Sequence, residues 1–374
     1  MHLNTPKARS ETAPARRRLA AALVLAPLLA GCSTLGYYAH TAGGHLRLLR
    51  EARPIEAWLA DPATPPGLRS RLQRVREIRR FAVAELGLPD NGSYTRYVAL
   101  GRPFVAWNVF AAPPFSVEPL TWCFPVAGCV AYRGYFDRVR AQAEARRLAA
   151  RGLDVYVGGV GAYSTLGWFA DPLPSSVIHY PEAELAGLIF HELAHQRLYV
   201  RDDTAFNESF ATAVALAGTR RWFAARGDPG AAARYRRDQA RRRQVVALIL
   251  AARRDLAALY ASGRGTADLA RGKAEIQRRL RRDYLALSRD WPPPKPFAGW
   301  FQGPLNNAQL ASVGAYHRHV AAFEALLRRS GDLRAFYRAA ARLGALAPEA
   351  RAAALARLAS TQGLAEAPDR QADE

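Results

Sequence analysis

The sequence contains no apolar run long enough to cross a bilayer as a helix. Its longest run, residues 19–30, has about twelve residues and contains Pro27, whereas a spanning helix needs about twenty. We also find no convincing internal repeat. Half of the 374 residues are hydrophobic, so the chain can bury a sizeable core and disorder is not its main state.

Lysine is nearly absent, occurring only at positions 7, 273 and 295, so arginine carries most of the net charge of +21. The arginines are spread over several helical stretches without interleaved aromatic residues, which is typical of solvated helix faces. We therefore expect no nucleic-acid partner. The cluster between residues 234 and 243 is interpreted as a solvated face, with contact to lipid phosphates as the alternative.

The first residues have the pattern of an export signal. Residues 1–18 are polar and end in three arginines, and the apolar run then closes on Leu-Ala-Gly-Cys, which resembles the lipobox of bacterial lipoproteins. We predict a signal peptide over 1–31 and lipidation of Cys32, with a plain signal sequence as the alternative. The expected location is the cell envelope, anchored to a membrane and facing the periplasm, and Ser33 favours the outer membrane.

Two further cysteines, Cys123 and Cys129, are separated by five residues that include a proline and a glycine. In an oxidising compartment such a pair is expected to form a disulfide. Two free buried thiols are the alternative, since no nearby cysteine or histidine completes a zinc site.

The periodicity of apolar residues predicts an α+β fold that is predominantly helical, with a small β-sheet next to a helix pair and a helical C-terminal half. Helices are expected over 37–86, 137–151, 181–199, 205–218, 231–262, 267–290, 306–329, 332–343 and 348–359, and strands within 94–110, 154–160 and 162–169.

The segment His191-Glu192-Leu-Ala-His195 lies inside the apolar-periodic run 181–199. On a helix the two histidines are one turn apart and point the same way, so they can bind one Zn²⁺. Glu192 is then placed to take a proton from a water molecule that the metal activates. A pair of hydrogen-bonded core histidines is the alternative.

Such a centre needs a third protein ligand, and Glu208 is the best candidate. Twelve residues separate it from His195, enough to leave the first helix, turn, and lay a second antiparallel helix beside the metal. Asp202 and Asp203 are nearer, but we expect them to lie in the turn and cap the second helix. A solvated surface position is the alternative for Glu208.

These stretches, together with 107–113, 122–137 and 162–169, resemble the bacterial zinc aminopeptidase family, a gluzincin-like group of HExxH metallopeptidases often encoded as lipoproteins. The resemblance covers most of the chain after the signal peptide. It implies one zinc ion per chain held by His191, His195 and Glu208, Glu192 as the catalytic acid and base, and hydrolysis of a peptide substrate.

One departure concerns the substrate. The Gly-x-Met-Glu-Asn segment that holds the substrate amine in large gluzincin aminopeptidases does not occur, and the only methionine is Met1. The segment 162–169 precedes the HExxH helix, where those enzymes have the Gly-x-Met-Glu-Asn segment, and it contains Tyr163, Ser164 and Thr165. We expect it to be either an exposed strand that pairs with an extended peptide substrate or an ordinary buried strand. The candidate oxyanion donors include Tyr163 and others further along the chain: Tyr180, Tyr316, His317 and His319.

The sequence thus predicts a signal peptide (1–31), an α+β metallopeptidase domain with the zinc site (32–218), a helical domain packed on it (219–362) and a frayed tail (363–374). The predicted function is a zinc-dependent peptidase, an aminopeptidase by resemblance, in the bacterial cell envelope. The alternative is a non-catalytic envelope lipoprotein that uses a structural zinc site as a binding module. Oligomeric state is not predicted.

Overall fold

The structure is a computed structural model that describes residues 35–125 and 127–365. The predicted signal peptide and the lipidation site Cys32 lie outside these residues, as do residues 366–374 of the predicted tail. Within the described ranges, no helix is both long and apolar enough to cross a membrane.

The chain divides into two compact units, residues 1–47 and residues 48–374. In the described part of the first unit, residues 35–47 are helical. Everything below concerns the second unit. The predicted boundary between residues 218 and 219 stays a prediction.

The second unit begins with a small three-stranded sheet and two helices. The short strand β1 (Arg53–Pro54) pairs antiparallel with β2 (Arg96–Val98), which pairs parallel with β8 (Leu173–Pro174). Helices α2 (Ile55–Ala60) and α3 (Pro66–Ala84) connect the first two of these strands.

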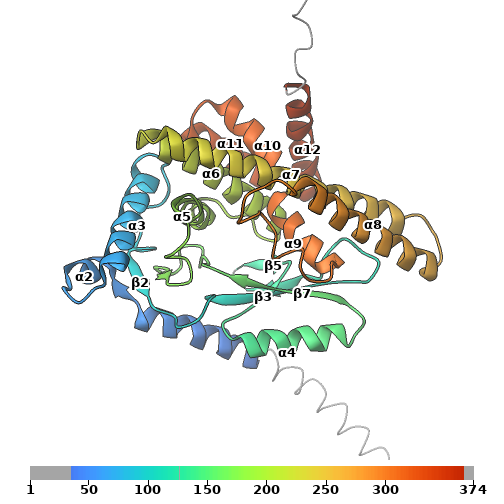
Figure 1. The fold of residues 1–374 in the computed structure, drawn as a ribbon, viewed down its shortest axis with the longest axis horizontal. Helices are drawn as coiled ribbons and strands as arrows, with labels where there is room; N and C mark the ends of the chain where they lie inside the picture. Colours follow the sequence, from blue (N-terminus) through green and yellow to red (C-terminus); the bar gives the residue numbers. More distant parts are fainter. Residues whose placement is uncertain (1–34, 126, 366–374) are drawn as a thin grey trace, which may run out of the picture. The chain divides into compact units, whose positions relative to one another are not determined.

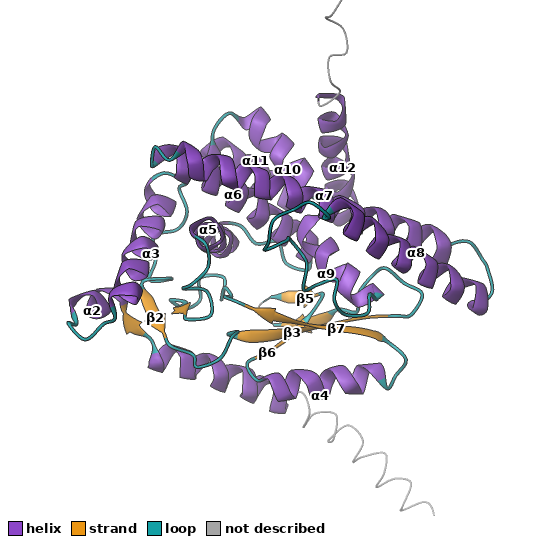
Figure 2. Cartoon of the chain, viewed as in Figure 1, coloured by secondary structure: helices purple, strands orange, loops and turns teal. Residues whose placement is uncertain are grey.

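The central sheet has the order β6–β3–β7 and is antiparallel throughout. Its strands are β3 (Ala106–Ala112), β6 (Arg133–Tyr135) and β7 (Asp154–Val160). Figure 2 shows α4 (Arg138–Ala149) below this sheet and α9 (Asn307–His317) above it. Because helices cover both faces, β3 is apolar along nearly its whole length and does not alternate.

A two-stranded hairpin, β4 (Trp122–Phe124) and β5 (Gly128–Val130), is closed by a disulfide between Cys123 and Cys129. The backbone N–H of Cys129 donates to Oδ1 of Asp202 at 2.6 Å, and the hydroxyl of Tyr199 donates to the carbonyl of Ala127 at 2.9 Å. The hairpin therefore lies against the turn between the next two helices.

Those two helices, α5 (Glu182–Arg197) and α6 (Thr204–Ala225), pack against each other at the centre of the unit (Figure 1). They are apolar around most of their circumference, which is typical of helices surrounded by protein. The side chains of α3, α5, α6 and the last helices form the main hydrophobic core.

The C-terminal part is helical. It consists of α7 (Pro229–Tyr260), α8 (Thr266–Leu287), α9, α10 (Val320–Ser330), α11 (Leu333–Gly344) and α12 (Pro348–Ala365). Helices α7 and α8 form a hairpin with its own apolar cluster, while α10, α11 and α12 pack on the main core.

These elements confirm the α+β, predominantly helical fold class. Four expectations were wrong in detail. The expected helical stretch 37–86 is interrupted by strand β1 and by the connection 61–65, and residues 162–169 form no strand. The helix expected to end at Gly218 continues to Ala225, and the expected helix 306–329 breaks into two at Arg318 and His319.

The missing strand has a local cause. The hydroxyl of Ser164 accepts from the N–H of Leu166 at 3.1 Å, and the hydroxyl of Thr165 accepts from the N–H of Phe169 at 3.1 Å. Leu166 and Gly167 have φ angles of 57° and 84°. Side-chain hydroxyls thus bind backbone groups that a strand would use, and fold the segment into turns.

Candidate metal centre

The start of α5 is fixed by its acidic first turn. Glu182 and Glu184 lie where the helix dipole favours negative charge. The indole N–H of Trp222, on α6, donates to Oε1 of Glu182 at 2.8 Å. The helix is therefore tied to its neighbour at one end, and the HExxH histidines lie near the other.

Three predicted ligand atoms converge between α5 and α6. The Nε2 atoms of His191 and His195 are 3.1 Å apart, and Oε2 of Glu208 lies 3.1 Å from the first and 3.5 Å from the second. His195 and Glu208 are buried. This is the arrangement that the sequence predicted, and the three residues form a group able to hold a metal ion.

The turn between the helices sets the position of Glu208. The side chain of Asn207 donates to the carbonyl of Val200 and accepts from its N–H, both at 2.7 Å. Asp203 caps α6 by accepting from the N–H of Phe206 at 2.9 Å, as expected. Asp202 instead binds the disulfide hairpin. Because Glu208 directly follows Asn207, these two hydrogen bonds of Asn207 help to fix the position of Glu208.

The spacing of the three atoms fits a zinc ion. Three ligands at about 2.0–2.1 Å from one tetrahedral ion are separated from each other by roughly 3.3–3.4 Å, and the observed separations are 3.1, 3.1 and 3.5 Å. Two imidazoles and one carboxylate are also a donor set found in catalytic zinc sites. The residues present therefore fit the predicted metal.

The charges in the group suit a cation. Burial by itself would raise the pKa of Glu208, but His195 and His191 outweigh it and lower that pKa to about 2, so the carboxylate is ionised. Burial raises the pKa of Glu192 above its ordinary value, against the opposing effect of the two histidines. Glu192 directly follows His191 on α5, and the charges of His191, His195 and Glu208 act on its pKa.

Among the candidate oxyanion donors, Tyr316 is brought to the site. Its ring stacks on that of His191, with centroids 6.1 Å apart and planes at 22°. The charge of Glu208 and then burial raise the pKa of Tyr316, so its hydroxyl is protonated and can donate. The hydroxyl of Ser209 donates to the carbonyl of Tyr316 at 3.4 Å, which links α9 to α6 beside Glu208.

The other candidates have different surroundings. Burial lowers the pKa of both His317 and His319 to about 4, and the N–H of His319 donates to the hydroxyl of Ser209 at 3.1 Å. The ring of Tyr163 packs edge-on against Phe136 at 5.5 Å. The carbonyl of Tyr180 accepts from Arg71 at 3.1 Å.

The loop with Ser164 and Thr165 lies against the end of α5. The side-chain amide of Gln196, next to His195, donates to the hydroxyl of Ser164 at 3.4 Å. It also donates to Oδ2 of Asp171 at 3.4 Å, and the N–H of Thr165 donates to the same oxygen at 2.8 Å. The loop thus contacts the last turn of α5, at the residue that follows His195, although it is no strand.

Sequence reasoning missed Asp171 and Gln196. Asp171 is fully buried, and burial, the largest effect, raises its pKa to about 6. A lone aspartate before a proline carries no signal of burial. Gln196 directly follows the HExxH motif, and that adjacency was the available clue.

The fold and the site together define an α+β protein in which a central helix pair carries a three-ligand group able to hold a metal ion. The family model described as "Putative aminopeptidase" matches residues 36–355. Since this is most of the chain, the protein belongs to that family. No curated protein and no solved structure matches the chain.

Proposed function

We propose that the protein is a zinc-dependent peptidase, with one Zn²⁺ per chain, that hydrolyses peptide bonds. The observation that carries the proposal is the convergence of His191, His195 and Glu208 on one point. Glu192 directly follows His191 on the same helix. Membership of an aminopeptidase family supports peptide hydrolysis as the reaction. Membership of this family does not favour the alternative function, a non-catalytic binding module.

In this proposal His191, His195 and Glu208 hold the metal. Zinc held there would supply Lewis-acid chemistry, polarising a carbonyl and lowering the pKa of a water molecule. The carboxylate of Glu192 accepts a proton from the attacking water and passes it to the leaving nitrogen, so the C–N bond breaks with net addition of one water. The hydroxyl of Tyr316 donates a hydrogen bond to the oxygen of the attacked carbonyl.

The test combines metal analysis with hydrolysis of a mixed peptide library. We expect the purified protein to hold about one zinc per chain. Glu192→Gln should keep the metal but lose activity by a factor of about 10²–10⁴. His195→Ala should lose both. Glu184→Gln is the matched control, because Glu184 is on the same helix, half exposed, and pairs with Arg242 at 2.7 Å.

Peptides with free and acetylated N-termini distinguish aminopeptidase from endopeptidase action. A library cleaved only where the amine is free supports the aminopeptidase assignment. Zinc content without any hydrolysis, unchanged by Glu192→Gln, contradicts the proposal and favours the binding module.

We also propose that the protein acts in the cell envelope, anchored to a membrane through lipidated Cys32. The lipobox-like sequence supports this location. Cys32→Ser should release the protein from membrane fractions. Equal partitioning of this variant and the unaltered chain would contradict the anchor.

A further inference from the structure

A cavity of about 500 Å³ lies between α10, α11 and α12, and is separate from the metal-binding residues. Its volume is within the range of roughly 300–1,000 Å³ that is typical of small-molecule sites. The apolar lining is Leu326, Ala339, Leu343, Leu346, Ala354 and Leu358. Leu326, Leu343 and Leu358 pack at the same time on the main core, so this lining is a fixed part of the fold.

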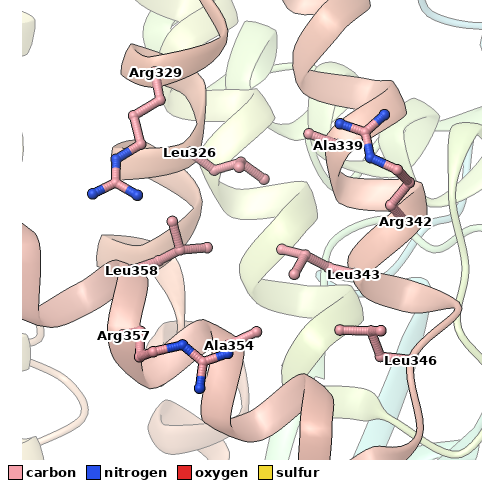
Figure 3. A pocket seen from close by; sticks show the side chains of 9 residues that line it. All are labelled: Leu326, Arg329, Ala339, Arg342, Leu343, Leu346, Ala354, Arg357 and Leu358. Atoms are coloured by element: carbon pink, nitrogen blue, oxygen red, sulfur yellow. The ribbon is translucent and has the colours of Figure 1, made fainter.

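The remaining lining residues are three arginines, one from each helix: Arg329 from α10, Arg342 from α11 and Arg357 from α12. Figure 3 shows their guanidinium groups around the leucine and alanine side chains. All three are exposed. Among the residues that the structure describes, no aspartate, glutamate or aromatic residue lines the cavity.

These arginines differ from others of the same helices. Arg351 of α12 is buried and pairs with Asp203 at 2.8 Å. For Arg329, Arg342 and Arg357, by contrast, no ion pair with a carboxylate is found in the described part of the chain. Three positive charges without a carboxylate partner at the rim of one apolar opening favour an anionic head group over a neutral one.

We propose that this cavity binds a single-chain lipid anion, a fatty-acid carboxylate, with its hydrocarbon chain on the leucines and its head group among the arginines. A guanidinium binds a carboxylate in bidentate fashion, and the leucines and alanines offer a chain only apolar contacts. The absence of aromatic lining residues disfavours nucleobases. This inference does not depend on the peptidase assignment.

The test is calorimetric titration of the purified protein with dodecanoate, and with dodecanol as the uncharged analogue. We expect dodecanoate to bind at least about ten-fold more tightly than dodecanol. In the series octanoate, decanoate, dodecanoate, each added methylene should tighten binding by up to about four-fold. Butanoate should not compete, which distinguishes a lipid site from a simple anion site.

Two triple variants remove the same net charge. Arg329→Gln, Arg342→Gln and Arg357→Gln together should weaken dodecanoate binding by about ten-fold or more and leave dodecanol binding unchanged. The matched control changes three exposed arginines of α10 and α11 that do not line the cavity, Arg328, Arg334 and Arg338, to Gln. It should bind dodecanoate within about two-fold of the unaltered protein.

A separate variant tests the apolar part. Leu346 is 39% exposed at the cavity, so Leu346→Trp fills the opening without disturbing the core and should abolish binding of both ligands. Equal loss in the two triple variants, or no binding of dodecanoate, would overturn the proposal. So would binding only to phosphatidylglycerol vesicles, which would identify a membrane contact instead.

Discussion

Arg351, on the last helix, donates from Nε to Oδ2 of Asp203 at 2.8 Å, across 148 positions of sequence. The other oxygen of Asp203 caps α6, the helix that carries Glu208. Arg351 also donates to the carbonyls of Gly344 and Leu346, at 3.0 and 2.9 Å, where α11 ends. One guanidinium therefore joins the C-terminal helices to the beginning of the helix that carries Glu208.

Replacing Arg351 by alanine should destabilise the protein by about 3 kcal/mol, because Asp203 then loses its charged partner and two carbonyls lose a donor. The side chain of Arg351 is only 7% exposed. Urea unfolding measures the loss, and Arg338→Ala, at an exposed position on α11, is the control that should change stability by about 0.5 kcal/mol or less. A loss below about 1 kcal/mol for Arg351→Ala would show that the pair is not structural.

Gly218 is required where α6 crosses the helix bearing the histidines. A Cβ at this position would lie 2.6 Å from Leu86 Cδ1 and 2.8 Å from Phe190 Cδ2. Gly218→Ala should therefore destabilise the fold by about 1–3 kcal/mol, although alanine favours helix by about 1 kcal/mol. It should also weaken zinc binding, since Phe190 precedes His191.

Gly187→Ala is the control for this substitution. A Cβ there would lie 3.4 Å from Thr219 Oγ1, an ordinary contact, so the helix preference for alanine should make the change neutral or stabilising. Thermal unfolding and zinc titration of both variants measure the difference. Equal stability of the two variants would contradict the close approach.

The disulfide hairpin supports the turn between α5 and α6. Replacing Cys123 and Cys129 by serine should lower stability by about 2 kcal/mol, the chain-entropy effect of a loop this short. Because Cys129 and Ala127 bind Asp202 and Tyr199, zinc affinity should fall as well. Reduction of the unaltered protein should reproduce the loss of stability in metal-free buffer, and the same treatment should not change the stability of the variant. A loss of stability of the variant on reduction would contradict the role of this disulfide.

Asp171→Asn should stabilise the protein in a pH-dependent way. The pKa of Asp171 is raised from 3.8 to about 6 in the folded state, chiefly by burial. The protonated carboxyl group of Asp171 therefore contributes to the free energy of unfolding fully below pH 3.8, and this contribution is lost as the pH rises to about 6. Asparagine stays neutral, so its advantage should grow to the order of 2 kcal/mol above about pH 7.

Urea unfolding at about pH 4.5 and about pH 7.5 measures this gain. Asp90→Asn is the control, since Asp90 is 71% exposed and pairs with Arg79 at 3.1 Å. A gain from Asp171→Asn that is the same at both pH values would show that burial does not govern this carboxyl group.

Much of the metal-binding group was predictable because it follows from local rules. A helix places residues i and i+4 on one face, so the spacing of His191 and His195 predicts that they meet. The short polar turn before Glu208 predicts a second antiparallel helix. Both conclusions need only the period of a helix and the length of a connection.

The errors arose where a local signal had two meanings. Gly218 was interpreted as a helix end, but it serves a close contact between helices, and a glycine has the same side chain in both situations. The apolar and aromatic residues of 162–169 suggested a strand, whereas hydroxyl hydrogen bonds and positive φ angles make turns there.

The order of residues along the chain was sufficient for the fold class, for most of the helices and for the approach of His191, His195 and Glu208, because periodicity, capping and turn length act over a few residues. Packing alone brought Tyr316 onto His191, buried Asp171 beside Gln196, and arranged three arginines around one cavity. Those arrangements bring together residues 13 to 125 positions apart. Their geometry depends on how whole helices fill space against each other, which no short stretch of sequence encodes.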